Sequence, residues 1–121
     1  MKRNPLLTWA AGDQHTLRFH VADLSLDIRG RTPAILSGYA GSWALSRRGT
    51  KGYFKTPVLT LDATIPDQTA SPGVVDVLVE SEDTADFLGP HHYQLEISDG
   101  SGGTEVVAEG DIEFVLNIED A

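Results

Sequence analysis

The chain has 121 residues, no cysteine and a formal net charge of −9. Its length suits one domain with its own core, and the lack of cysteine excludes disulfides, thiolate zinc sites and thiol nucleophiles. The negative charge argues against nucleic acid as a partner, and no stretch resembles a signal peptide or the ~20 apolar residues of a membrane span. We therefore expect no membrane association and a single domain over residues 1–121, in which residues 1–7 could form a flexible N-terminal arm.

The two halves of the chain carry opposite charge. Residues 1–55 hold all nine Lys and Arg residues against three acids, a net of +6, whereas residues 56–121 hold fifteen acids and no Lys or Arg, a net of −15. Summed charge steers association rather than folding. If the halves occupy different faces of the domain, each copy presents a positive surface to the negative surface of the next, which favours head-to-tail assembly.

The first half predicts strands separated by a long connection. Residues 15–22 alternate apolar and polar side chains, the pattern of a strand with one buried face, and residues 24–28 could extend it past a kink. Residues 30–42, rich in glycine, are expected to form a connection. Trp43 then points inward on another strand, and a basic loop over residues 47–52 follows.

The middle of the chain predicts further strands and one helical turn. Residues 59–63 and 75–80 both alternate with period two. Residues 81–88 interrupt that alternation. Ser81, followed by three acids in the next five residues, is typical of the N-terminus of a single helical turn.

The C-terminal part predicts a hairpin. Residues 93–97 form a strand, residues 99–103 a glycine-rich connection, and residues 106–108 a short strand that ends at a bend or bulge at Gly110. A last strand covers residues 111–118. Seven or eight short strands with one helical turn indicate an all-β sandwich.

The sequence contains no pattern that indicates a catalytic, cofactor or metal site. The histidines lack the HxH or HExxH spacing of a ligand pair, and no phosphate loop or G-x-S-x-G elbow occurs. His91 and His92 are adjacent, so on a strand they would face opposite sides, at the turn that enters it. We expect a protein that is not an enzyme and that uses no cofactor or metal.

Charged residues are the best candidates for a partner contact. Four cations within nine residues of a loop would form a compact positive surface that could meet acidic surfaces of neighbouring subunits, although an ordinary solvated hairpin explains the pattern equally well. Trp9 could belong to the edge of the core or anchor a partner. The residues expected at the contact are Arg47, Arg48, Lys51 and Lys55 on the basic side and Glu80, Glu96 and Glu113 on the acidic side.

Four segments share a pattern with one known group of proteins. They are residues 8–13 with the strand after them, residues 43–45, residues 75–97 with the motif "strand, D-T, turn, Y-x-L-x-I", and a closing hairpin over residues 99–115. In these segments the chain resembles bacteriophage and prophage proteins related to the N-terminal domain of the baseplate upper protein. The resemblance implies an immunoglobulin-like antiparallel β-sandwich of seven to eight strands.

The resemblance also implies a function. We expect a non-enzymatic structural protein of the phage tail, baseplate or neck, located in the virion and, during assembly, in the host cytoplasm. Its partners would be other virion proteins and further copies of itself in a ring or trimer. Two alternatives remain open: a decoration protein on a capsid lattice, and a sandwich that binds cell-surface carbohydrate through aromatics such as Tyr39 or Tyr53.

Overall fold

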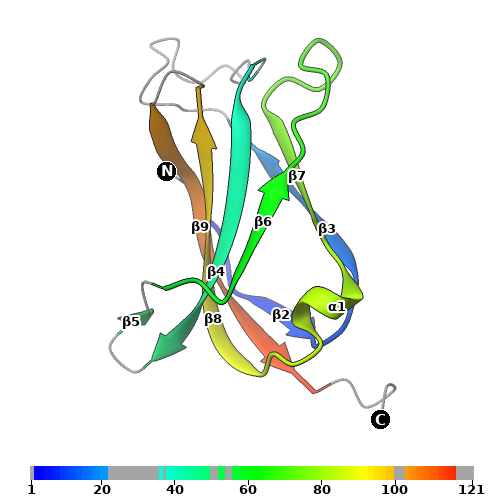
Figure 1. The fold of residues 1–121 in the computed structure, drawn as a ribbon, viewed down its shortest axis with the longest axis vertical. Helices are drawn as coiled ribbons and strands as arrows, with labels where there is room; N and C mark the ends of the chain where they lie inside the picture. The colour runs from blue at the N-terminus through cyan, green and yellow to red at the C-terminus, as the bar shows by residue number, and fades with distance from the viewer. Residues whose placement is uncertain are drawn as a thin grey trace.

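The computed structural model describes residues 2–21, 36, 38–49, 52–53, 56–99 and 103–116. Over these residues it contains nine strands and one helical turn (Figure 1). Their bounds are β1 Lys2–Arg3, β2 Leu7–Ala10, β3 His15–His20, β4 Ala40–Gly49, β5 Gly52–Tyr53, β6 Leu59–Ala63, β7 Val74–Val79, α1 Ser81–Thr84, β8 Gly89–Ser98 and β9 Thr104–Val115.

The described strands form a larger and a smaller sheet. The larger sheet has the order β1–β9–β8–β4–β5, with β2 also paired to β9 and β6 also paired to β4, and the smaller sheet pairs β3 with β7. Figure 1 shows the curl of the larger sheet. A bridge between Thr64 and Asp76 links the end of β6 to β7, so the sheets approach each other on that side. The all-β, sandwich-like fold that the sequence predicts is confirmed.

The larger sheet is mixed rather than purely antiparallel. β1 and β2 run parallel to β9, with Arg3 beside Glu109 and Trp9 beside Phe114, whereas β9, β8 and β4 are antiparallel neighbours. Pro5 lies between the two short strands, where its missing N–H removes no ladder hydrogen bond. The N-terminal residues that could have formed an arm lie along the edge of β9 wherever the structure describes them.

The side chains that the alternating pattern assigns to inner faces form the core. Trp43 is fully buried and packs against Tyr93, whose ring also contacts Phe19. Trp9 is buried as well and belongs to the same cluster. Burial of each such large apolar side chain contributes roughly 1.5–3 kcal/mol. Further core members come from β7 and β8: Val75, Val77, Val79, Leu95 and Ile97.

The C-terminal hairpin differs from the predicted one, because β9 is one long strand without an interruption at Gly110. The irregularity lies where the register shifts between Leu95 and Glu96 of β8, which leaves Val107 of β9 as an extra residue. Gly110 pairs regularly with Tyr93. Glycine is required there because a Cβ atom would lie 2.7 Å from the Tyr93 hydroxyl oxygen.

The helical turn is fixed to the N-terminal part of the chain. Its N-cap is Glu80, one residue earlier than predicted, and the Glu80 N–H donates to the Asp83 carboxylate at 2.8 Å. Thr84 is fully buried, and its Oγ1 accepts a hydrogen bond of 3.1 Å from the Gly12 N–H. This contact holds α1, and the connection that follows it, against the turn between β2 and β3.

Several predictions fall on residues outside the described part of the chain. They concern the extension of a strand over residues 24–28, most of the connection over residues 30–42, and the end of the last strand beyond Leu116. Leu36, within that connection, is described: it is fully buried, and its N–H donates to the Gln68 side chain at 3.1 Å.

Candidate interaction surface and its polar network

A row of charged side chains crosses the outer face of the larger sheet. The strand register places His92 of β8 opposite Asp111 of β9, and Arg3 of β1 beside Glu109 of β9. Arg48 comes from β4, on the other side of β8. Because side chains two residues apart share a face of a strand, Glu109 and Asp111 point the same way. Four strands thus contribute to one network.

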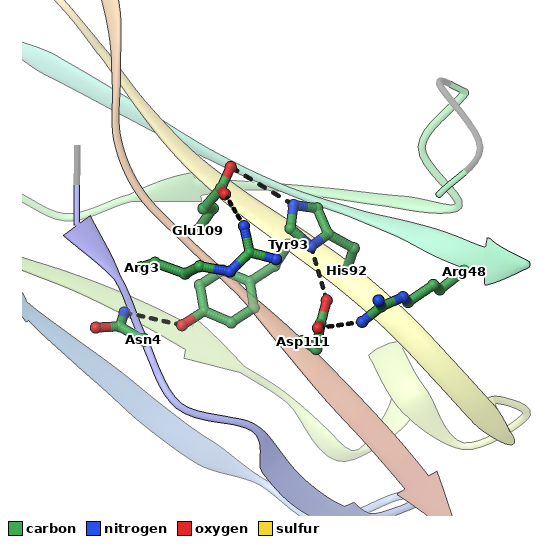
Figure 2. A network of polar contacts seen from close by, with 7 residues as sticks. All are labelled: Arg3, Asn4, Arg48, His92, Tyr93, Glu109 and Asp111. Carbon is green, nitrogen blue, oxygen red and sulfur yellow. Dashed lines mark hydrogen bonds and ion pairs between the residues drawn. The ribbon is translucent and has the colours of Figure 1, made fainter. Parts of the chain in front are cut away.

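The members of this network contact one another directly (Figure 2). Arg3 Nη1 donates to Glu109 Oε1 at 2.6 Å, and His92 Nδ1 lies 2.8 Å from Asp111 Oδ1. Arg48 donates to the other oxygen of Asp111. His92 Nε2 lies 3.8 Å from Glu109 Oε2. The imidazole therefore sits between two carboxylates, each of which also holds a guanidinium group.

The centre of the network is shielded from water although it lies on the outer face. The His92 side chain is 4% exposed, that of Glu109 11% and that of Asp111 20%. Burial raises the pKa of Asp111, but the hydrogen bond from His92 and the nearby positive charges, Arg48 first, outweigh it and leave that pKa below its ordinary value. Two guanidinium groups balance two carboxylates, an arrangement suited to joining strands.

Asn4, the residue after β1, contacts the core on the other side of the sheet. Its Nδ2 donates to the Tyr93 hydroxyl oxygen at 2.9 Å (Figure 2), and its N–H donates to the Glu109 carbonyl oxygen at 2.8 Å. Burial raises the pKa of Tyr93, an effect that the hydrogen bond from Asn4 opposes. Arg3 at the end of β1 and Asn4 after it therefore contact opposite faces of the larger sheet.

Arg18 forms a similar pair on the smaller sheet. It lies directly opposite Asp76, and its Nε and Nη2 atoms contact the two carboxylate oxygens at 2.8 and 2.9 Å. This bidentate hydrogen bond lowers the pKa of Asp76. Among the four arginines whose side chains the structure describes, Arg3, Arg18 and Arg48 are thus ion-paired within the chain, and Arg47 is not.

One end of the sandwich combines exposed charges with exposed apolar side chains. β4 ends there, β8 begins there, and the connection from α1 leads into the start of β8 (Figure 1). A pocket of about 300 Å³ opens at this end. Leu88, on its rim, is 60% exposed. The other residues that line it are Arg47, Arg48, Asp86, Phe87, Pro90 and His91.

The residues predicted for a basic contact lie differently from what the sequence suggested. Arg47 and Arg48 belong to strand β4, which continues to Gly49 and pairs with β5, so they do not lie in a loop. Both are exposed, but Arg48 is engaged by Asp111. Lys51 and Lys55 lie outside the described residues.

The residues predicted for the acidic side do not form one surface in the structure. Glu80 is exposed beside α1, and the hydrogen bond and charge of Glu82 raise its pKa. Glu96 is exposed on β8, opposite Ser42, and Glu113 is half-buried near the end of β9. Tyr39, an aromatic candidate for carbohydrate binding, packs against the core.

The sequence did not reveal the network around His92. The two adjacent histidines were expected to face opposite sides at a turn, and they do face opposite sides, but both are buried within β8. His92 joins the outer-face network, whereas His91 stacks on Phe87 with ring centroids 5.3 Å apart. The useful signal would have been Asp111 and Glu109 two residues apart on the adjacent strand.

Comparison with known proteins adds no family. The chain matches no known protein-family model and no curated protein. The likeness to phage baseplate proteins therefore depends on the sequence segments described above. Within the described residues, no helix is long and apolar enough to cross a membrane, and no three His, Asp or Glu side chains converge into a cluster that could hold a metal ion.

Proposed function

We propose that the chain is a non-enzymatic structural protein of a bacteriophage virion, in the tail, baseplate or neck, whose subunits associate through charge-complementary contacts. The observation that carries the proposal is the distribution of arginine partners. Three described arginines are paired within the chain, which leaves Arg47 exposed and without an ion pair among the described residues. Its charge is available to a partner.

Acidic residues supply the complementary charge. Glu82, Asp86 and Glu96 are exposed, and none of them has an ion pair among the described residues. Exposed pairs between subunits strengthen at low ionic strength and are screened over roughly 8 Å at physiological salt. A subunit with this surface is expected to associate by contacts that weaken as salt is added.

The buried histidine favours a structural role over a catalytic one. His92 is almost completely covered, and the carboxylates beside it are already engaged by Arg3 and Arg48. A general acid or base must reach the proton that it transfers within about 3 Å, directly or through one water molecule. A histidine in this position is better suited to joining strands than to meeting a substrate.

The proposed location in the virion can be tested on purified phage particles. An antibody against the chain should detect it in phage particles purified through a density gradient, at a constant ratio to the major capsid protein across the particle peak. Release of the chain from the particles by a mild salt wash would point to loose association. Its absence from the particle peak would contradict the proposal.

The charge dependence is tested on the purified protein. Light scattering should give an oligomer at low salt whose mass falls at high salt, and Arg47→Glu should abolish the oligomer at low salt. Arg47→Gln, which removes the charge without reversing it, should have an intermediate effect. Arg48 stays unchanged, because its reversal would place a third acid beside Asp111 and Glu109. An Arg47→Glu protein that assembles like the wild type would rule out this contact.

A further inference from the structure

We propose that the end of the sandwich around Arg47 and Asp86 binds a second copy of this chain across a twofold axis. The inference rests on the proposed function in one respect, that the subunits associate. It adds the surface, the pairing of residues and the symmetry. In the contact, Arg47 of each copy meets Asp86 of the other, and Leu88 of each copy enters the pocket beside them.

This surface is held firmly by the fold. The strand register places Arg47 opposite His91, and Phe87 stacks on His91 and meets Phe114 edge to face at 5.5 Å. The hydrogen bond from the Gly12 N–H to the buried Thr84 fixes the helical turn from which the connection with Asp86 departs. A surface that is ordered before binding loses little conformational freedom on binding.

The charges of this surface are complementary to those of the same surface on a second copy. Arg47 and Asp86 are both exposed, both line the same pocket, and neither has an ion pair or hydrogen bond among the described residues. In a twofold contact each patch meets its own copy, so residue i contacts j and j contacts i. One cation and one anion in the lining of the same pocket then give two equal ion pairs.

The shape of the surface suits the same contact. Leu88 protrudes, with 60% of its surface exposed, beside a pocket of about 300 Å³ that also has Phe87 and Pro90 in its lining. The pocket lining therefore combines apolar side chains with charged ones, as the surfaces of protein–protein interfaces do. Insertion of each Leu88 into the opposite pocket would bury both.

The position of the charges favours a closed pair over a head-to-tail chain. Head-to-tail assembly needs complementary charges on different surfaces of the subunit. Here the end of β4, the start of β8 and the helical turn lie at the same end of the molecule (Figure 1), and Arg47 and Asp86 line one pocket. The contact therefore joins two copies end to end and closes on itself.

The experiment uses two charge reversals and their mixture. Sedimentation velocity of the whole chain at low salt should give a dimer for the wild type. Arg47→Glu alone and Asp86→Lys alone should each weaken the dimer by about 30-fold or more, because two pairs become repulsive in each. Mixing the two variants should restore a dimer. In the heterodimer the introduced glutamate faces the introduced lysine, and the remaining Asp86 faces the remaining Arg47.

Matched controls separate the contact from general charge and from folding. Asp62→Lys changes the net charge as Asp86→Lys does, at an exposed position of β6, and should dimerise like the wild type. Leu88→Ser should weaken the dimer without altering its salt dependence. Unchanged circular dichroism spectra would show that the variants are folded.

The outcomes also distinguish this inference from the proposed function. A mixture that stays monomeric, or a wild-type trimer or ring that Asp86→Lys leaves intact, would overturn the twofold contact. The chain could still be a virion protein in either case, because its presence in purified particles is measured separately. Conversely, a restored heterodimer together with absence from particles would support the contact and contradict the virion role.

Discussion

At the scale of single residues, the packing and hydrogen bonding of Tyr93 explain which residues occupy several neighbouring positions. Its ring packs against Trp43 and Phe19, its hydroxyl group accepts a hydrogen bond from Asn4, and the ring lies over Gly110 of the neighbouring strand. A large aromatic ring in the middle of a sheet needs space on the strand beside it. The glycine provides that space, so these positions are coupled by packing.

This coupling predicts the effect of a methyl group at position 110. Gly110→Ala should lower the free energy of unfolding by about 1–3 kcal/mol, because its Cβ would lie within 2.7–2.9 Å of the Tyr93 ring and hydroxyl group. Urea denaturation measures the loss. In a Tyr93→Leu background, which removes the ring, the same substitution should cost much less. Equal costs in both backgrounds would show that the ring is not the cause.

At the scale of elements, the larger sheet is held together by charge as well as by its backbone ladder. Arg3 attaches β1 to β9, and Asp111 of β9 contacts both β8 and β4 through His92 and Arg48. Isolated exposed ion pairs contribute little to stability. The imidazole and the two carboxylates at the centre of this network are shielded from water, so removing one of their partners leaves a shielded charge with fewer contacts.

The first prediction at this scale concerns the N-terminal strand. Arg3→Ala should increase hydrogen exchange at the Asn4 amide, which donates to Glu109, because the guanidinium that holds β1 to β9 is lost. Amide exchange by mass spectrometry or NMR measures this. Thr8→Ala, at an exposed position of β2, serves as the control and should not change it. Unchanged protection in Arg3→Ala would mean that backbone pairing alone holds the strand.

The second prediction concerns acid stability. The pKa of Asp111 is lower in the folded chain than its ordinary value of about 3.9, so below about pH 5 the unfolded chain binds more protons. Its contribution to stability is therefore complete above that range and is lost as pH falls through the folded pKa. Wild-type stability should fall more steeply below pH 5 than that of Asp111→Asn, in urea titrations at a series of pH values.

The control for this titration is an acid outside the network. Asp62→Asn, at an exposed position of β6, should keep the wild-type pH dependence. Asp76, whose pKa is also lowered, is present in all three proteins and cancels from the comparison. Parallel curves for the wild type and Asp111→Asn would exclude Asp111 as a source of acid sensitivity.

At the scale of the whole molecule, the strands with local signals could be predicted from the sequence. The alternation of Val75, Val77 and Val79 and of Leu95 and Ile97 placed these side chains on buried faces, and all five are buried. Such patterns are local and depend only on strand periodicity. The parallel pairing of β1 and β2 with β9 depends on contacts between opposite ends of the chain, which no local pattern contains.

The candidate network could not be predicted for a related reason. The hairpin closed by Asp99 and Gly103, if regular, would place His92 opposite Gly110. The bulge at Val107 shifts the register by one residue and brings His92 to Asp111 instead. A shift of one residue exchanges the faces of every side chain beyond it, so the network follows from an irregularity without a clear sequence signal.

Oppositely charged residues from the two halves of the sequence also pair within one subunit. Strands of the first half, β1 and β4, lie beside strands of the second half, β9 and β8. Arg3 and Arg48 consequently meet Glu109 and Asp111 within one sheet. Part of the charge separation along the chain is therefore used inside the subunit, and among the described arginines Arg47 is the one that we propose for a contact between subunits.

The pairing of β1 with β9 has a consequence for synthesis in the cell. Arg3 and Glu109 are 106 positions apart, so the strand that is made first can complete its sheet only after Glu109 has left the ribosome. Until then the N-terminal segment has no β9 to pair with. Pairing at this edge therefore waits for β9, and nascent chains that stall before Glu109 should expose a protease-sensitive N-terminus.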